Sequence, residues 1–317
     1  MSDSTRRLKL PTMMAYGFGQ VSEAVKSNGF NIFLLFYYNQ VLHVSATGTS
    51  IALAIALVFD AITDPVAGSL SDKLQSRWGR RHPFILFAAI PLAITFYLLF
   101  NPPAGLSEMG NILWLCCFAV LVRASMTFYH VPHLALGAEL TENFQERTRI
   151  VAFRQFFSTF GSAAAAVIGL GYFFADSHGG RLSIENYTPY ALTLGILMVI
   201  TIWYSAWGTQ KEIPHLSEPA EKPSQGVLHR LLQETREAFI NRSFRWLFFG
   251  VLIVFIMSGV NNALDLYMYQ YFWELTGREM LWLQIAIMAG LMLGVFLTST
   301  LHRYTDKKFG VILGTGA

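Results

Sequence analysis

The sequence is poor in charged residues and in cysteine. Only 14% of its 317 residues are charged and 53% are hydrophobic, whereas a typical soluble domain is about 25% charged. The two cysteines, Cys116 and Cys117, are neighbours inside an apolar run, which is typical of helix packing rather than of a disulfide framework. These shortages exclude secreted, fibrous and nucleic-acid-binding proteins and indicate a membrane protein.

Apolar stretches of membrane-spanning length recur along the whole chain. A helix needs about 20 residues to cross the ~30 Å hydrocarbon core of a bilayer. The hydrophobic runs predict eight spans, near residues 12–40, 46–71, 82–101, 109–137, 148–175, 187–208, 245–273 and 279–302. We therefore expect an all-α integral membrane protein with the lipid bilayer as its surroundings.

The basic residues are distributed unevenly between the two sides of these spans. Most of the 23 Lys and Arg lie in the N-terminal tail and in the loops after the second, fourth, sixth and eighth spans. Cytoplasmic loops of membrane proteins are enriched in Lys and Arg, so we expect the N-terminus to be cytoplasmic. The net charge of +3 is dispersed over several loops, and no nucleic-acid partner is expected.

A change in composition divides the chain after the sixth span. Three prolines precede the amphipathic segment VLHRLLQETREAFI, which predicts a cytoplasmic linker between two helical bundles. The expected division is a tail at 1–11, a six-helix bundle at 12–208, a central loop at 209–244 and a partial second bundle at 245–317. If the two halves repeat, the complete protein has roughly 440 to 450 residues, and we expect this chain to be a fragment.

Two aspartates in the second span predict a cation site. Asp60, Thr63 and Asp64 lie within four residues of one another and therefore share one helix face. A charge at mid-bilayer costs about 2.5–3.5 kcal/mol, so two nearby acids favour a shared cation or proton. The structural alternative is that one aspartate caps a kink at Pro65 or pairs with Lys26 or Arg154.

Polar residues in other spans are candidates to face this site. Arg123, Thr127 and His130 form one stripe of the fourth span, and His130 has a proton affinity near neutral pH that suits proton coupling. It is equally a candidate for a plain hydrogen-bonding wall residue. Glu23 and Lys26 in the first span are spaced to form an ion pair, which is either part of the site or self-contained.

An intramembrane metalloenzyme is the competing interpretation of the histidines. His130 and His133 have a spacing that can share a metal, with Glu139 further along the chain. Pro132 lies between the histidines and no HExxH motif occurs. We therefore expect no catalytic activity, no cofactor, and no metal beyond a possible sodium ion.

The short loop after the second span predicts a cytoplasmic gate. Asp72, Arg80 and Arg81 can form ion pairs there, and we expect Gly68 and Gly79 to allow tight turns. The pairs are expected to act as a conformational latch.

Two segments, FDAITDPVAGSLSDKLQSRWGRRHPFIL and YHVPHLALGAELTENFQERTRI, resemble the glycoside-pentoside-hexuronide:cation symporters of the major facilitator superfamily. The resemblance runs over essentially the whole chain and implies that superfamily's fold of two six-helix bundles. It also implies that Asp60, Thr63, Asp64 and Thr127 bind the cation, with Thr63 replacing an amide. Arg154 matches the sugar-site arginine of the melibiose carriers.

The sequence departs from those carriers at two sugar-binding positions. The Lys-Asp pair of their first helix is Glu23 and Ala24 here, and the aspartate of their fourth helix falls on His130. Both galactoside-binding carboxylates are therefore missing. The candidate substrate-binding residues are Glu23, Lys26, Arg123, Tyr129, His130 and Arg154.

Together these observations predict a monomeric symporter in a bacterial inner membrane that moves a small polar solute, by resemblance a sugar or glycoside, by alternating access. The coupling ion is expected to be H+ or Na+, with the proton favoured because the oxygen ligands are sparse. The alternatives are a transporter of amphipathic lipids or other solutes and a non-transporting membrane receptor or partner protein.

Overall fold

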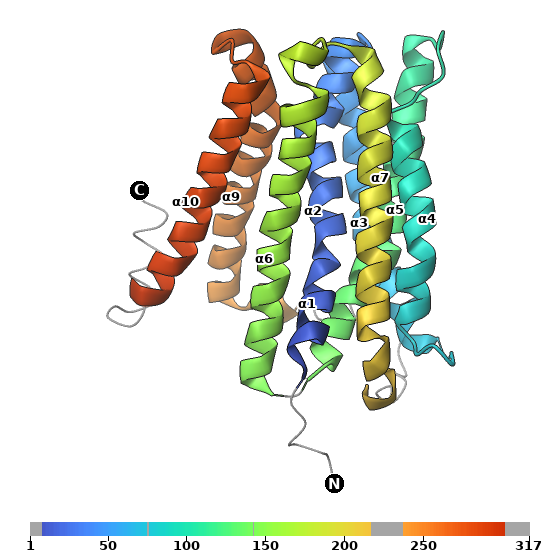
Figure 1. Ribbon diagram of the computed structural model, residues 1–317, viewed down its shortest axis with the longest axis vertical. Coiled ribbons are helices and arrows are strands. Elements are labelled where there is room, and N and C mark those ends of the chain that lie inside the picture. Colours follow the sequence, from blue (N-terminus) through green and yellow to red (C-terminus); the bar gives the residue numbers. More distant parts are fainter. Residues whose placement is uncertain (1–7, 75, 142, 217–236, 302–317) are drawn as a thin grey trace.

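The computed structural model describes residues 8–74, 76–141, 143–216 and 237–301. Every regular element in this part of the chain is helical, and the long helices run roughly side by side (Figure 1). Within these described residues, six helical stretches are long and apolar enough to cross a bilayer: Ala46–Lys73, His82–Leu99, Glu108–Glu139, Glu146–Phe173, Ile184–Pro214 and Arg242–Phe272. The expectation of an all-α membrane protein is confirmed.

The first expected span consists of short helices joined end to end. They are α1 (Leu10–Phe18), α2 (Gln20–Asn28), and the π-helices η1 (Gly29–Leu34) and η2 (Tyr37–Val41). Gly19 joins α1 to α2 with helical backbone angles, so the chain does not turn there. Because the first span is divided into short helices, it is not counted among the six long apolar helices.

Single long helices form the next three spans. They are α3 (Ala46–Lys73), α4 (His82–Leu99) and α5 (Glu108–Glu139). Ser45 and Ser107 cap α3 and α5, because each hydroxyl accepts a hydrogen bond from the amide three residues later. Pro65 does not interrupt α3.

The remaining elements complete the bundle. They are α6 (Phe144–Ile168), η3 (Gly169–Phe173), η4 (Asp176–His178), η5 (Ile184–Asn186), α7 (Tyr187–Thr209), η6 (Gln210–His215), α9 (Arg242–Tyr267), η7 (Met268–Phe272) and α10 (Gly277–Leu301). The expected eighth span is thus a helix, although it is not among the six long apolar stretches. The amphipathic segment expected in the central loop lies mostly outside the described residues.

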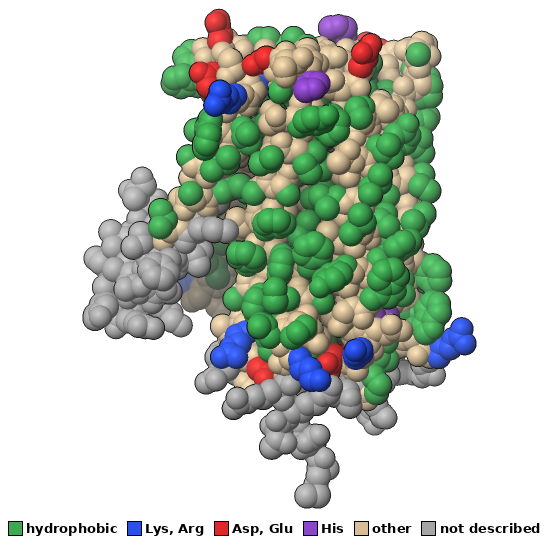
Figure 2. Space-filling view, in the orientation of Figure 1, with side chains coloured by type: hydrophobic (Ala, Val, Ile, Leu, Met, Phe, Trp, Pro, Cys, Tyr) green, Lys and Arg blue, Asp and Glu red, His purple; other side chains and the backbone are tan. Residues whose placement is uncertain are grey.

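The surface agrees with a membrane environment. On the face shown in Figure 2, hydrophobic side chains cover the middle of the molecule, and most Lys and Arg side chains lie near the end at which α1 begins. The opposite end has more acidic and histidine side chains. On this face most of the described basic side chains therefore lie at the end where α1 begins, in agreement with the uneven charge distribution.

α9 and α10 contact the first six helices near one end. α9 contacts η1, and α10 contacts α6 and η3, at the end opposite the start of α1. Towards its C-terminal end α10 leans away from α6 (Figure 1), and the first 21 residues of α9, Arg242–Asn262, are exposed. The second group of helices thus joins the first at the end opposite the start of α1.

Close packing around Gly19 holds the first span against α5 and α7. A Cβ atom at Gly19 would lie 2.5 Å from the Tyr129 hydroxyl, 2.7 Å from His133 Nε2 and 2.7 Å from the Ser205 hydroxyl. The Tyr129 hydroxyl donates a hydrogen bond to the Gly19 carbonyl at 2.7 Å. Glycine therefore lets three polar side chains reach the backbone of the first span.

We expect Gly19→Ala to lower the stability of the folded protein. Overpacking a tight contact typically costs about 1–3 kcal/mol, and here three side chains must move. Gly259→Ala is the matched control, because nothing lies within 4 Å of its added Cβ. The measurement is the thermal unfolding midpoint in detergent; equal midpoints for the two variants would contradict this account of the packing.

Candidate functional site

Ionisable side chains from the first, second and fourth spans form a charged cluster, which we define as Glu23, Lys26, Asp60, Asp64 and Arg123. Arg123 Nη1 on α5 forms an ion pair with Asp60 Oδ2 on α3. One turn further along both helices, the Thr127 hydroxyl donates to Asp64 Oδ1 at 2.8 Å. The structure thus brings the stripe of α5 against the two aspartates, as the sequence spacing predicts.

The first span contributes the other ion pair of the charged cluster. Lys26 Nζ lies 3.8 Å from Glu23 Oε1, and it is also close enough to interact electrostatically with the two aspartates. The Phe30 ring lies beneath two cations, with its centroid 5.9 Å from Lys26 Nζ and 5.3 Å from Arg123 Cζ. Cation–π contact partly compensates for the lost hydration of both groups.

The acidic oxygens of the charged cluster are incompletely partnered. Asp60 Oδ1 is buried and accepts no hydrogen bond from the described residues. Asp64 has no ion-pair partner within 4.0 Å among them and receives the Thr127 hydroxyl alone. Three carboxylates therefore face two described cations within the charged cluster, which leaves room for one added positive charge.

Thr63 is oriented differently from the expectation. Its hydroxyl donates to the backbone carbonyl of Phe59 at 3.1 Å and lies 3.4 Å from that of Asp60. Such back-bonding is common for threonine in helices. The structure therefore places this side chain against its own helix, where its hydroxyl bonds to backbone carbonyls instead of the two carboxylates.

The hydrogen-bond contact of His130 is with the first span, although it is also in electrostatic range of Asp64. Its Nε2 is 3.4 Å from Gln20 Nε2, and the same Gln20 amide donates to Glu23 Oε2 at 3.2 Å. Ser27 donates to the other Glu23 oxygen at 2.6 Å. Sequence spacing gave no sign of Gln20 and Ser27, because a neutral polar residue in a mixed helix carries no strong signal.

Tyr129 and His133 are packing residues in this structure. Both are fully buried; His133 Nε2 lies 3.0 Å from the Tyr16 carbonyl oxygen, and its ring stacks on Tyr16 with centroids 4.4 Å apart. Tyr129 is bonded to the Gly19 backbone and does not line the pocket described below. No cluster of three or more His, Cys, Asp or Glu suited to a metal occurs in the part of the chain that the structure describes.

Arg154 on α6 is separate from these ion pairs. It interacts with the Tyr16 phenol and is in electrostatic range of His130. None of the described carboxylates lies within 4.0 Å of its guanidinium. Arg154 is thus a half-buried cation available to a ligand.

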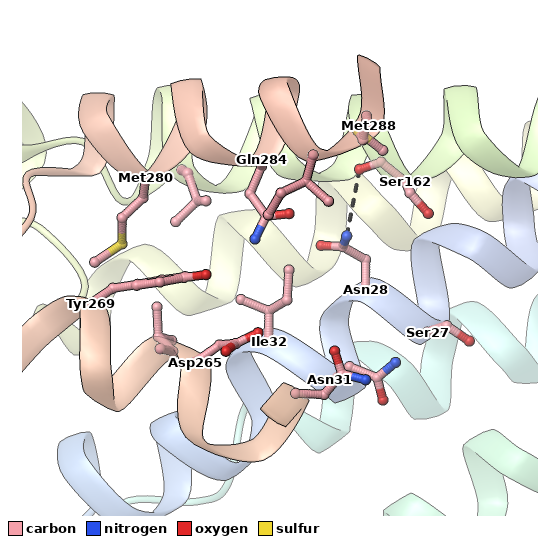
Figure 3. A pocket seen from close by; sticks show the side chains of 14 residues that line it. Ser27, Asn28, Asn31, Ile32, Ser162, Asp265, Tyr269, Met280, Gln284 and Met288 are labelled. Atoms are coloured by element: carbon pink, nitrogen blue, oxygen red, sulfur yellow. Dashed lines mark hydrogen bonds between the residues drawn. The ribbon is translucent and has the colours of Figure 1, made fainter. Parts of the chain in front are cut away.

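A pocket of about 290 Å³ adjoins the charged cluster. It lies between the first span, α6, α9 and α10 (Figure 3). We call it the amide pocket after its main polar lining, which is Asn28, Asn31, Asn262 and Gln284, together with Asp265 and Tyr269. Ser27 also lines it, so its hydrogen bond to Glu23 connects the two sites.

Three expected gate residues, Asp72, Arg80 and Arg81, form ion pairs together with Glu139, and we call these four residues the arginine clasp. Arg81 Nη2 lies 2.5 Å from Asp72 Oδ1 and 2.9 Å from Glu139 Oε1, and Arg80 Nη2 lies 2.9 Å from the same Glu139 oxygen. The clasp joins α3, the following loop and α5 within the first bundle. Glu139, which the sequence suggested as a metal ligand, is its shared acceptor.

One gate expectation is wrong and another is confirmed. Gly68 lies inside α3 and forms no turn; a Cβ there would be 3.6 Å from Val131 Cγ1, so its small size serves packing against α5. Gly79 has φ +76°, a left-handed conformation that favours glycine. The tight turn before the arginines therefore depends on Gly79.

A protein-family model described as "MFS/sugar transport protein" matches residues 15–317. The chain belongs to this family. MFS/sugar transport proteins are transporters and not enzymes, and membership agrees with the resemblance to glycoside:cation symporters and with the helical fold. The metalloenzyme interpretation of the histidines is thereby set aside.

Three curated relatives show how far the similarity extends. An uncharacterized symporter of Synechocystis is 35% identical over 170 residues, 52% of this chain and 31% of its own length. The glucuronide carrier protein homolog of Escherichia coli is 23% identical over 98% of this chain and 66% of its own. The sodium-dependent lysophosphatidylcholine symporter 1-A of Danio rerio is 26% identical over 51% and 30%. The chain thus spans between about a third and two thirds of the length of these relatives.

The arginine clasp predicts a difference between its two acids. The Asp72 side chain is 57% exposed and that of Glu139 is 13% exposed. Exposed ion pairs contribute about 0–1 kcal/mol, whereas removing one partner of a buried pair costs about 3–5 kcal/mol. We expect Glu139→Gln to lower the free energy of unfolding by several kcal/mol and Asp72→Asn by less than about 1 kcal/mol, measured by denaturation in detergent. Equal losses would show that burial does not set the strength of the clasp.

Proposed function

We propose that the complete protein is a symporter that carries a small polar solute together with a monovalent cation by alternating access. Membership of the MFS/sugar transport family and the charged cluster within the membrane spans support this function. The arrangement of basic loops supports a multi-pass topology with the arginine clasp and the N-terminus on the cytoplasmic side of a bacterial inner membrane.

The observation that carries the proposal is the unbalanced acidity of the charged cluster. Asp60 Oδ1 is buried without a hydrogen-bond donor, and Asp64 has a hydroxyl as its recorded partner. Keeping such groups in a bilayer costs several kcal/mol, which a bound cation offsets. A monovalent cation that falls through 100 mV delivers about 2.3 kcal/mol, enough for a roughly 50-fold solute gradient.

The solute class is proposed to be a sugar or glycoside. The Escherichia coli relative is named a glucuronide carrier protein homolog, and similar recognition here would use Glu23, Lys26 and Arg154, which offer charged hydrogen bonds to hydroxyl groups. Arg123 is held by Asp60 and His130 by Gln20, so we assign them to shaping the site. Tyr129 is not retained as a ligand because its hydroxyl is bonded to backbone.

An amphipathic lipid is the second candidate solute. The Danio rerio relative is named a lysophosphatidylcholine symporter. Against this candidate, the pocket beside the charged cluster is small and has four carboxamide groups in its lining, which offer hydrogen bonds that an acyl chain cannot use. The two candidates are distinguished by measuring whether lysophosphatidylcholine inhibits sugar uptake, which is expected only if the lipid binds at the solute site.

We expect Asp60→Asn and Asp64→Asn each to abolish uphill accumulation by the full-length protein, because each removes a negative charge from the cation site. Insertion into the membrane should be unchanged or improved, since each variant removes a charge from a membrane-spanning helix. The measurement is solute accumulation in right-side-out vesicles, with protein amount checked by immunoblot. Asp176→Asn, an exposed acid in η4, is the control. Wild-type accumulation in both variants of α3 would refute the assignment of the cation to α3.

We propose the proton as the coupling ion. Sodium favours several hard oxygen ligands, and the Thr63 hydroxyl is engaged with its own helix backbone, which leaves Asp60, Asp64 and Thr127 as the proposed oxygen set. A carboxyl pair in low dielectric can instead share a proton.

The test of the ion varies one gradient at a time. Uptake should respond to an imposed pH gradient and be lost with a protonophore, while added sodium at fixed pH has little effect. Membrane potential is clamped in both series. Strong stimulation by sodium with indifference to the protonophore reverses the ion assignment and leaves the symporter proposal intact.

A further inference from the structure

A buried glutamine in the first span connects His130 with an acid of the charged cluster. Gln20 lies on α2 and is buried. Its Nε2 donates to Glu23 Oε2 at 3.2 Å and lies 3.4 Å from His130 Nε2 on α5. Its Oε1 is buried and accepts no hydrogen bond from the described residues. Both partners of this side chain therefore lie on the nitrogen side of its amide.

The charge of Glu23 determines which way this amide faces. An ionised carboxylate accepts hydrogen bonds and donates none, whereas an amide nitrogen donates and does not accept. The Gln20 nitrogen must face Glu23 Oε2, because the amide oxygen in its place would bring two acceptors together. The same nitrogen has no lone pair to offer His130. His130 Nε2 is consequently the acceptor, and the neutral ring carries its proton on Nδ1.

A proton on His130 Nε2 conflicts with this arrangement. The charged imidazole donates from both nitrogens, so two donors would face each other across the 3.4 Å between His130 and Gln20. Rotation of the amide presents Gln20 Oε1, the oxygen without a partner, to the charged ring. The same rotation takes the amide donor away from Glu23 Oε2. A protonated His130 and the Gln20–Glu23 hydrogen bond therefore exclude each other.

Several charged groups influence whether the His130 ring gains a proton. Two acids favour the charged ring, whereas two cations and burial oppose it. Histidine is the side chain whose charge ordinarily changes between about pH 5 and 8. The charged and titratable neighbours come from four helices: Glu23 and Lys26 on α2, Asp64 on α3, Arg154 on α6, and His133 on α5 itself.

We propose that Gln20 is a positioning residue that makes the availability of Glu23 to the solute depend on the protonation of His130. The inference rests on the proposed function, in which Glu23 is a solute ligand. While His130 is neutral, Gln20 and Ser27 each donate to one Glu23 oxygen. Once His130 is protonated, Glu23 Oε2 loses Gln20 and is open to a hydroxyl group of the solute. Acidification therefore raises the affinity for the solute, in addition to any effect of the ion bound on α3.

The first experiment observes the His130 ring directly in the full-length protein. Protein labelled with ¹⁵N-histidine is placed in lipid nanodiscs, and the His130→Gln variant identifies the His130 signals. The imidazole ¹⁵N chemical shifts distinguish the two neutral tautomers and the charged ring between about pH 5 and 9. Gln20→Leu removes the amide donor, and Gln20→Met does the same with a straight side chain if leucine disturbs folding. Gln210→Leu is the control, because Gln210 is exposed in η6.

We expect neutral His130 to carry its proton on Nδ1 in the wild type and in Gln210→Leu. Both tautomers should be present in Gln20→Leu and Gln20→Met, because the ring has lost its donor. Glu23→Gln should also give both tautomers, since a neutral side chain no longer dictates how the Gln20 amide faces. A wild-type ring protonated on Nε2 when neutral, or a tautomer unchanged in all three variants, overturns the proposal.

The second experiment measures uptake with the same pH on both sides of the vesicle membrane. The probes are D-xylose, D-glucose and D-glucuronate. For each probe that is taken up, the half-saturation concentration of Gln20→Leu should be about tenfold lower than that of the wild type at about pH 8, which is the effect of one hydrogen bond to a charged group. At about pH 5 the two values should be equal, because Glu23 Oε2 is open in both.

The two experiments separate this proposal from the symporter function. Half-saturation concentrations that are equal at both pH values, or that differ by the same factor at both, overturn the link between His130 and Glu23. Loss of all uptake in the wild type, together with a tautomer that depends on Gln20 and Glu23, refutes the proposed solute class and supports the positioning by Gln20. Uptake that is normal while the tautomer ignores Gln20 leaves the symporter standing and refutes the positioning.

Discussion

A charge that lies in the bilayer needs an opposite charge or a hydrogen bond to offset its lost hydration. This requirement determines how the charged side chains of the first bundle are paired. Asp60 pairs with Arg123 and Glu23 pairs with Lys26, and each pair joins groups that would be costly alone. Asp64 is the acid left over. Because its recorded partner is the Thr127 hydroxyl, the charged cluster remains one positive charge short, and a cation that moves with the solute can supply it.

Close helix packing decides which side chains can take part in this compensation. Gly19 allows Tyr129, His133 and Ser205 to approach the first span, and the Tyr129 hydroxyl, His133 Nε2 and the Ser205 hydroxyl lie within hydrogen-bond distance of its backbone carbonyls. The same packing sets the rotation of the first span and directs Glu23 and Lys26 towards α3 and α5. The polar groups that hold the helices are thus distinct from those that remain available to an ion or a solute.

The sequence predicted the helices well because the length of each hydrophobic run can be read from the local sequence. α3, α4, α5 and α7 begin and end within about two residues of expectation, within the scatter of helix assignment. The opposition of Asp60 and Asp64 to Arg123 and Thr127 also followed from helical spacing.

The sequence did not predict side-chain contacts that depend on how two helices are rotated relative to each other. Spacing could not show that His130 faces Gln20, or that Thr63 turns to its own backbone. Gly68 was expected to allow a tight turn although it lies inside the expected span at 46–71, and α3 continues through it as regular helix to Lys73. The amide pocket could not be predicted from the sequence for the same reason. Four helical segments contribute to it, and no two of its polar side chains form a recognisable motif.

The contact of α9 and η7 with the first span consists of hydrogen bonds that can open. Tyr267 donates to Asn39 Oδ1 at 3.1 Å, and Tyr271 donates to Gln40 Oε1 at 2.5 Å. Neutral hydrogen bonds contribute about 0.5–1.5 kcal/mol each, so a few of them hold the helices together without locking them. The alternating access proposed above would change this contact, and a near-balanced equilibrium responds to free-energy differences of this size. Hydrogen bonds of this strength would therefore let α9 and α10 move relative to the first span.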